Sequence, residues 1–94
     1  MLSTLGPDGM ATLRDHPARL RQVNSEVEQM GCRVVAQWAL LGEYDFATVL
    51  EAPDDRAVAR VAVTLGARGT LKTRTLAAIP IDDFVELLAP GDGA

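Results

Sequence analysis

The sequence predicts an α+β fold in which the elements follow in the order strand, helix, strand, strand, helix, strand, and then a short helix. Three observations predict this fold. Apolar residues recur at helical spacing in two segments, residues 20–30 and 57–65. Two strand-like apolar runs, residues 34–41 and 45–51, flank a turn that contains a glycine. A third such run, residues 70–79, follows the second helical segment.

The first predicted strand is short. Residues 1–5 are mostly apolar, and the turn-forming sequence Gly6-Pro7-Asp8-Gly9 ends them. We therefore expect a strand that is shortened at its start.

Residues 10–30 predict a helix that is broken or kinked at Pro17, because proline lacks the amide donor that a helix interior requires. We expect Asp15 to cap the second part and Gly31 to end it. The second part has one apolar face, formed by Leu20, Val23, Val27 and Met30.

The next two runs predict a pair of strands covered on both faces. An antiparallel sheet with one wet face would alternate apolar and polar residues, whereas here apolar residues occupy both parities. In the first run we place Val34, Ala36, Trp38 and Leu40 on one face, and Val35, Ala39 and Leu41 on the other.

The chain then predicts a helix, a strand and a last helix. Asp54 and Asp55 suit the positive end of a helix dipole, and Gly66 or Gly69 ends that helix. Its apolar stripe consists of Ala57, Val58, Val61, Ala62 and Leu65. Residues 70–79 are predicted as a strand that Pro80 breaks, and residues 81–88 as a short amphipathic helix.

With right-handed crossovers, this order gives the ferredoxin-like βαββαβ arrangement, a four-stranded antiparallel sheet with two helices on one face. We expect a single domain over residues 1–89 and a disordered tail over residues 90–94. The other sheet face is also apolar, because apolar residues occupy both sets of alternating positions, and it therefore has to pack against another surface. A second copy is the simplest occupant, so we expect a homodimer or a higher homo-oligomer.

Composition excludes several classes of function. The net charge of −4 and the scattered arginines argue against nucleic-acid binding. No segment reaches the ~20 apolar residues of a membrane span, and a single cysteine without a signal-like start predicts a cytoplasmic protein. One histidine and one cysteine sixteen positions apart do not make a metal site, and we expect no cofactor.

The sequence Gly42-Glu43-Tyr44-Asp45 resembles the Gly-x-Tyr-Asp signature of the GYD domain family. The similarity extends to residues 4–9, 51–55, 66–69 and 78–84, and so covers almost the whole chain. It implies the dimeric α+β barrel form of the ferredoxin-like fold, with no established activity. Other families with this form include cofactor-free monooxygenases, haem-handling enzymes and ligand-binding regulators. The chain departs from the family at its first strand, which looks shortened.

Three candidate ligand-binding residues lie in or near the signature turn. Tyr44 and Asp45 can donate and accept hydrogen bonds at the mouth of a pocket. Alternatively, Gly42 permits the turn, Asp45 bonds nearby backbone amides and Tyr44 packs on an edge. Trp38, the only tryptophan, either lines a ligand cavity between the sheets of two subunits or packs in a core or interface.

Two further candidates lie elsewhere. His16 has the titration range of a general base or a haem ligand, but it directly precedes Pro17, where an exposed loop histidine is ordinary. Arg74 shares a strand face with Lys72, and the two can bind an anion or simply face solvent.

Three functions stay open, and the sequence does not decide whether the protein is an enzyme. The leading hypothesis is a small homo-oligomeric protein that binds a small apolar or aromatic ligand at the sheet face. The enzyme alternative is a monooxygenase-like or haem-handling activity, which requires a cavity between the helices or between subunits into which His16, Trp38, Tyr44 or Asp45 converge. The third is a purely structural interaction module.

Overall fold

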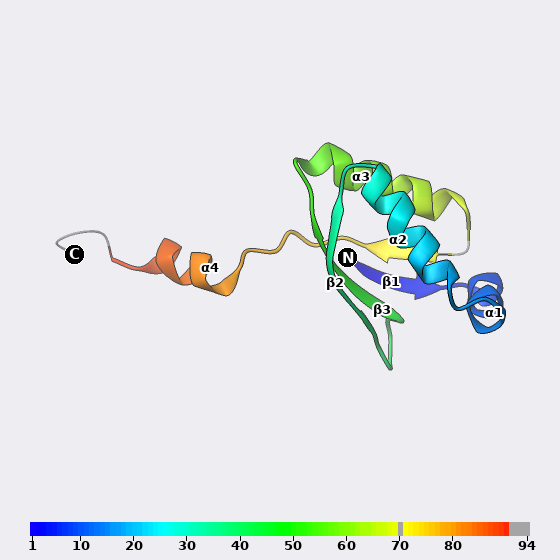
Figure 1. Ribbon diagram of the computed structural model, residues 1–94. Helices are drawn as coiled ribbons and strands as arrows, with labels where there is room; N and C mark the ends of the chain where they lie inside the picture. The colour runs from blue at the N-terminus through cyan, green and yellow to red at the C-terminus, as the bar shows by residue number, and fades with distance from the viewer. Residues whose placement is uncertain (70, 91–94) are drawn as a thin grey trace.

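The computed structural model describes residues 1–69 and 71–90 and contains one four-stranded antiparallel sheet in the order β2-β3-β1-β4 (Figure 1). The strands are β1 (Leu2–Leu5), β2 (Arg33–Ala39), β3 (Phe46–Glu51) and β4 (Leu71–Arg74). The short strand β1 lies inside the sheet, paired with β3 and β4. This order confirms the predicted ferredoxin-like α+β fold.

The helices are α1 (Pro7–Asp15), α2 (Arg19–Gln29), α3 (Asp55–Ala67) and α4 (Ile81–Leu88). Helices α2 and α3 lie side by side over one face of the sheet, as expected, and α4 stands away from it (Figure 1). Within the described part of the chain, no helix covers the opposite face.

The segment between β1 and β2 confirms the predicted break at Pro17 but corrects two details. Helix α1 starts at Pro7, so the cluster predicted to be a turn is the first turn of a helix, where the missing amide of proline costs nothing. Asp15 does not cap α2, which has Ala18 at its N-cap and no side-chain cap bond. Gly31 ends α2 as predicted, with a φ of 94°.

Helix α3 begins as the sequence predicts. The Ala57 amide donates a hydrogen bond of 2.9 Å to Oδ1 of Asp54, and Asp55 lies in the first turn. Its apolar stripe reaches the core, where Val61 is fully buried. The buried cluster consists of Val27, Cys32, Ala57, Val61 and Leu65.

Strand β2 contains an irregularity that corrects the predicted faces. Val34 pairs with Leu50 and Ala36 pairs with Val49, so Val35 is an extra residue opposite β3. This β-bulge reverses the side-chain parity along β2. Val34 therefore lies on the helix-covered face, opposite to Ala36 and Trp38, and the prediction that the three share one face was wrong.

The C-terminal part departs most from expectation. Strand β4 ends at Arg74, so the strand predicted over residues 70–79 was too long, and Thr70 is outside the described residues. Residues 75–90, which we call the C-terminal arm, are all exposed and project from the body (Figure 1). The principal extents of the described chain are 60 × 28 × 19 Å. The disorder predicted for residues 90–94 falls, beyond Pro90, on residues that the structure does not describe.

Candidate functional site

The signature turn between β2 and β3 is tied to the neighbouring strand β1 through Asp45. Its Oδ2 atom accepts a hydrogen bond of 2.7 Å from the Leu5 amide. Its own amide donates to the Ser3 carbonyl at 2.8 Å, and its carbonyl accepts from the Leu40 amide, also at 2.8 Å. All three groups of Asp45 thus hold backbone in place. This arrangement matches the structural alternative considered for Asp45.

Tyr44 and Arg74 form a second connection. Nη1 of Arg74 donates to the Tyr44 hydroxyl at 3.1 Å, which links the turn to the last residue of β4 across β1. Tyr44 is half-buried and Arg74 is exposed. The sequence did not predict this contact, since the two residues are 30 positions apart.

The tip of the turn is exposed. Gly42 has a φ of 134°, a backbone conformation that residues with a side chain rarely adopt. The preceding Leu41 is fully exposed, and Leu40 and Glu43 are also exposed. We call residues 40–43 the hairpin tip. It presents apolar side chains from a turn that Asp45 and Tyr44 hold in place.

A row of paired residues crosses the uncovered face of the sheet. Trp38 pairs with Ala47, Ala47 with Leu2, and Leu2 with Arg74, so one row spans all four strands. The neighbouring pairs on the same side are Ala36 with Val49 and Thr4 with Lys72. We call these eight residues the open face.

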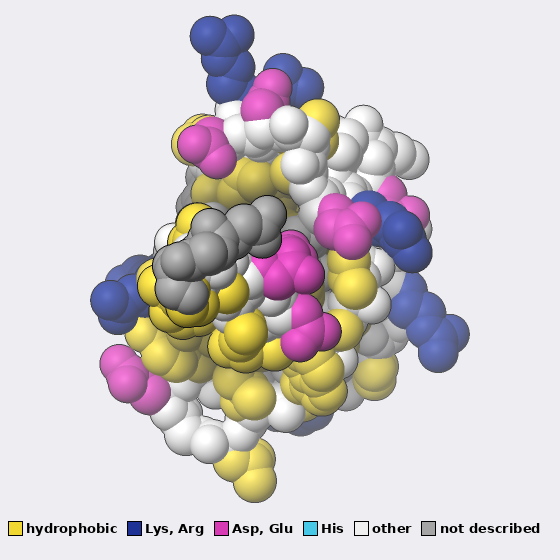
Figure 2. Space-filling model, turned by 90° about the vertical axis from the view of Figure 1, so that its left-hand side faces the viewer, with side chains coloured by type: hydrophobic (Ala, Val, Ile, Leu, Met, Phe, Trp, Pro, Cys, Tyr) yellow, Lys and Arg dark blue, Asp and Glu magenta, His cyan; other side chains and the backbone are white. Residues whose placement is uncertain are grey.

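The open face is apolar over β1, β2 and β3 and basic over β4. Trp38 is 55% exposed and Val49 44% exposed. Lys72 and Arg74 are also exposed, and neither has an ion-pair partner among the described residues. Figure 2, which views the molecule along the arm, shows hydrophobic side chains on the arm and around it. Large exposed apolar patches of this kind mark contact surfaces.

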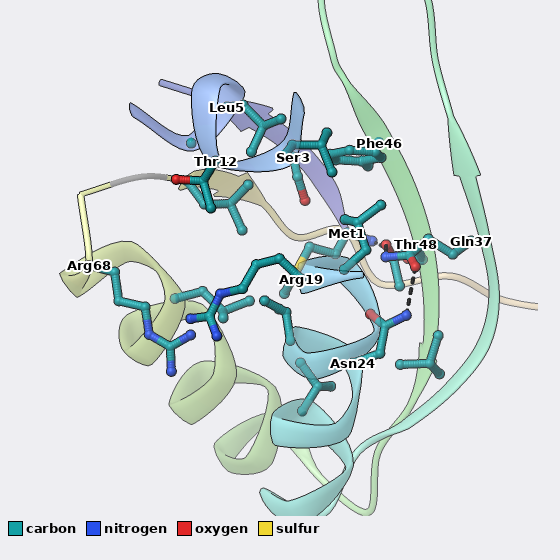
Figure 3. A pocket seen from close by; sticks show the side chains of 18 of the residues that line it. Met1, Ser3, Leu5, Thr12, Arg19, Asn24, Gln37, Phe46, Thr48 and Arg68 are labelled. Carbon is teal, nitrogen blue, oxygen red and sulfur yellow. Dashed lines mark hydrogen bonds between the residues drawn. The ribbon is translucent and has the colours of Figure 1, made fainter. Parts of the chain in front are cut away.

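The helix-covered face contains a cavity instead of a fully packed core. It has a volume of ≈ 330 Å³ and lies between the sheet and helices α1, α2 and α3 (Figure 3). Most of its wall is apolar, from residues such as Leu20, Val23 and Phe46. Arg19 and Arg68 also line it, but both contact the carboxylate of Glu26, which compensates their charge.

Polar side chains of the sheet form part of the cavity wall. Nδ2 of Asn24 donates to Oε1 of Gln37 at 2.7 Å, and Nε2 of Gln37 donates to the Thr48 hydroxyl at 3.0 Å. Figure 3 shows this chain of amides and the Ser3 hydroxyl directed toward the cavity. The Met1 α-ammonium donates to the Thr48 carbonyl at 2.8 Å, and its partial burial lowers its pKa.

The five candidate residues do not converge on this cavity. Trp38 and Arg74 share a row of the open face, and Tyr44 joins them through its bond to Arg74. His16 is exposed in a shallow depression between α1 and α2. None of the five lines the cavity. The groups named for the enzyme alternative therefore do not converge on the cavity between the helices.

Sequence reasoning missed the residues that do line the cavity. Ser3, Gln37 and Thr48 lie on strands, and each is a polar residue beside apolar neighbours. That placement was the available signal, but the sequence analysis predicted both faces of β2 to be covered, and the bulge at Val35 hid that Gln37 lies on the same face as Val34. Among the described residues, no three His, Cys, Asp or Glu side chains lie close enough to hold a metal ion.

The fold and these surfaces define a small ferredoxin-like α+β domain with an uncovered sheet face and a fixed hairpin tip. The GYD domain family model matches residues 1–88, so the chain belongs to the GYD domain family. This confirms the resemblance found in the sequence.

A relative in Thermus thermophilus is named "Glutamine synthetase and cystathionine beta-lyase binding protein". It is 51% identical to this chain over 89 residues, which are 94% of this chain and 94% of that protein. No solved structure gives a significant match to this chain. Within residues 1–69 and 71–90, the helices are too short or too polar to cross a membrane.

Proposed function

We propose that this protein is a protein-binding module whose partners are metabolic enzymes of the kind named for its Thermus relative, glutamine synthetase and cystathionine beta-lyase. The observation that carries the proposal is the exposed, apolar hairpin tip, whose base is anchored by Asp45 and Tyr44. A contact residue that is already held in place loses little conformational freedom when it binds. The backbone that presents Leu41 is restricted in this way, because Asp45 and Tyr44 anchor the base of the turn.

The hairpin tip suits an enzyme surface better than the cavity or His16 does. A single exposed leucine at a turn can insert into a pocket on a folded partner, where a few central apolar residues supply most of the binding energy. Glu43 beside it adds one negative charge at the rim. The family signature thus acts as a scaffold for Leu41 and not as a set of catalytic groups.

Binding of the purified chain to glutamine synthetase and to cystathionine beta-lyase from the same organism tests this proposal by surface plasmon resonance. We expect Leu41→Ser to weaken binding by about 30-fold, the effect of removing a central contact residue. Val63→Ser is the matched control, since Val63 is equally apolar and 70% exposed, on α3. No binding to either enzyme, or equal loss in both variants, would contradict the proposal.

The same chain is proposed to self-associate through its open face, as a homodimer or a higher homo-oligomer. The exposed Trp38 and Val49 support this, because a 94-residue domain gains little from leaving such side chains in water. Sedimentation velocity at micromolar concentration provides the measurement. A single monomeric species would rule out this part of the proposal.

A second candidate function is the binding of a small apolar or aromatic molecule, and the cavity favours it. Its ≈ 330 Å³ is at the small end of the range for ligand pockets, and its wall combines apolar side chains with a few polar groups. In this candidate function the ligand would bind beneath the helices and not on the open face, where Trp38, Tyr44 and Arg74 lie.

An NMR titration with indole, a small neutral aromatic probe, separates the two locations. Binding in the cavity shifts the amide signals of Leu20 and Thr48 and leaves that of Trp38 unchanged. Shifts confined to Trp38 and its neighbours would move the ligand to the open face. Absence of shifts at millimolar indole would remove this candidate function.

A further inference from the structure

The C-terminal arm exposes an unusual number of large apolar side chains for a segment that lies outside the body. Seven of them are exposed: Leu76, Ile79, Ile81, Phe84, Val85, Leu87 and Leu88. Exposing so many apolar side chains to water is unfavourable. We therefore expect the arm to pack against another surface.

Helix α4 is built to lie on an apolar surface. Ile81, Phe84, Val85 and Leu88 have the spacing of one helical face, whereas its three carboxylates lie at the other positions. An isolated helix of eight residues is not stable in water, because its few hydrogen bonds do not offset the cost of nucleation. Docking of the apolar face supplies the missing stabilisation.

The open face complements the arm in both hydrophobicity and charge. It offers Trp38 and Val49, which are exposed, and the cations of Lys72 and Arg74. The arm carries Asp82, Asp83 and Glu86 and no basic residue. None of these three carboxylates has an ion-pair partner among the described residues.

The dimensions also agree. Residues 75–80 extend up to about 20 Å at ~3.3 Å per residue, and α4 adds about 12 Å at ~1.5 Å per residue. The outer strands of a four-stranded sheet lie about 15 Å apart. An arm of this length crosses the whole open face of another molecule.

We propose that the C-terminal arm docks on the open face of a second copy of this chain, and that two copies exchange their arms. The proposal rests on the self-association proposed above and identifies the element that closes it. The exchange is reciprocal, as two-fold symmetry requires, so each copy both provides an arm and receives one. Trp38, whose role the sequence left open, then lies beneath the arm of the partner subunit.

Paramagnetic relaxation in mixed samples tests the location of the arm. A chain carrying a nitroxide at Ala89→Cys is mixed with an isotope-labelled chain that carries none. The native Cys32 is buried, and the wild-type chain treated with the same reagent controls for its labelling. We expect broadened amide signals at Trp38, Val49 and Lys72 of the isotope-labelled chain. In the control sample, one chain carries both the nitroxide and the isotope label and is diluted with unlabelled protein. If these signals broaden only in this sample, the arm folds onto its own body and the proposal is overturned.

Sedimentation equilibrium supplies the second test, on the full-length variant Phe84→Ser/Leu88→Ser. We expect the dimer dissociation constant to rise by about 30-fold or more, since two central contact residues are lost. Val63→Ser is the control. Lys72→Glu should weaken the dimer several-fold and Arg60→Glu, on the exposed side of α3, should not.

The outcomes separate this inference from the proposed function. An unchanged dissociation constant in Phe84→Ser/Leu88→Ser overturns arm exchange and leaves self-association through the sheet intact. A full-length chain that is monomeric at micromolar concentration overturns both. Loss of enzyme binding in the arm variant, with dimerisation unchanged, assigns the arm to the enzyme and also overturns exchange.

Discussion

The two faces of the sheet differ in polarity, and the difference is the reverse of that expected of an isolated domain. The covered face places polar side chains, among them Ser3 and Thr48, beneath the helices and around a cavity. The open face presents Trp38 and Val49 to solvent. A domain that functioned alone would be more stable with the apolar residues on the covered face and the polar residues on the open face. This difference is the basis for the proposal that the open face is a contact surface, and the covered face surrounds a cavity instead of a dense core.

Hydrogen bonding explains how the covered face tolerates its polar residues. Gln37 joins Asn24 to Thr48, so each amide group has a partner. Among the described residues, no fully buried side-chain nitrogen or oxygen lacks one. Burial of these groups consequently costs little free energy. The apolar groups of the other face, in contrast, remain unfavourably exposed to water until a partner covers them.

The largest predicted effect concerns the packed part of the covered face. Val61→Ala removes two methyl groups from the centre of the buried cluster and should lower the free energy of unfolding by about 2 kcal/mol. Urea denaturation monitored by circular dichroism measures this loss. Val63→Ala on the exposed side of the same helix should change it by less than about 0.5 kcal/mol. Equal losses would mean that α3 does not separate a covered side from an exposed one.

A slightly smaller effect is expected for Asp45→Ala. This change removes the carboxylate that accepts from the Leu5 amide, and hydrogen bonds to charged groups contribute about 1.5–3 kcal/mol. Denaturation should show a loss of about 1.5 kcal/mol and, in addition, weaker enzyme binding through a less ordered hairpin tip. The control for the denaturation measurement is Glu43→Ala, because Glu43 lies in the same turn but is exposed. A stable Asp45→Ala variant would return Asp45 to the candidate ligand-binding groups.

Elements with local signals were predictable from the sequence. Pro17 marks the break between α1 and α2, Asp54 caps α3, and the spacing of apolar residues identifies α4. Each of these depends on a few adjacent residues, and the physics of a cap or a helix break does not require knowledge of the tertiary structure. The same is true of Asp45, for which the sequence offered a structural alternative that the hydrogen bonds match.

Features that depend on pairing partners were not predictable. The bulge at Val35 is defined only relative to β3, and it puts Gln37 on the same face of the sheet as Val34. Strand β4 stops at Arg74 because β1, its partner, is only four residues long, although residues 75–79 are as apolar as a strand. The cavity depends on three helices and the sheet together, so no local pattern of residues could indicate it.

The comparison of faces also predicts a moderate cost for Gln37→Leu. This substitution leaves Asn24 and Thr48 without their shared partner, and the cost should be about 1 kcal/mol in urea denaturation. The control is Gln29→Leu at the exposed end of α2, which should change the free energy of unfolding little. A stabilised Gln37→Leu variant would mean that the covered face is simply an underpacked core and would weaken the case for a ligand in the cavity.

An effect of similar size concerns the hairpin tip and depends on backbone conformation alone. Gly42 has a φ of 134°, and a Cβ placed there meets no atom within 4 Å, so any cost of Gly42→Ala is strain and not a clash. Such strain costs about 1 kcal/mol. Gly66→Ala is the matched control, because Gly66 is helical, has no positive φ and also has open space around it. It should stabilise α3 by up to about 1 kcal/mol. If thermal denaturation shows a loss of stability for Gly42→Ala and a gain for Gly66→Ala, Gly42 sets the backbone direction at Leu41. A gain in both variants would show that the hairpin tip relaxes freely and is too mobile to act as a preformed contact.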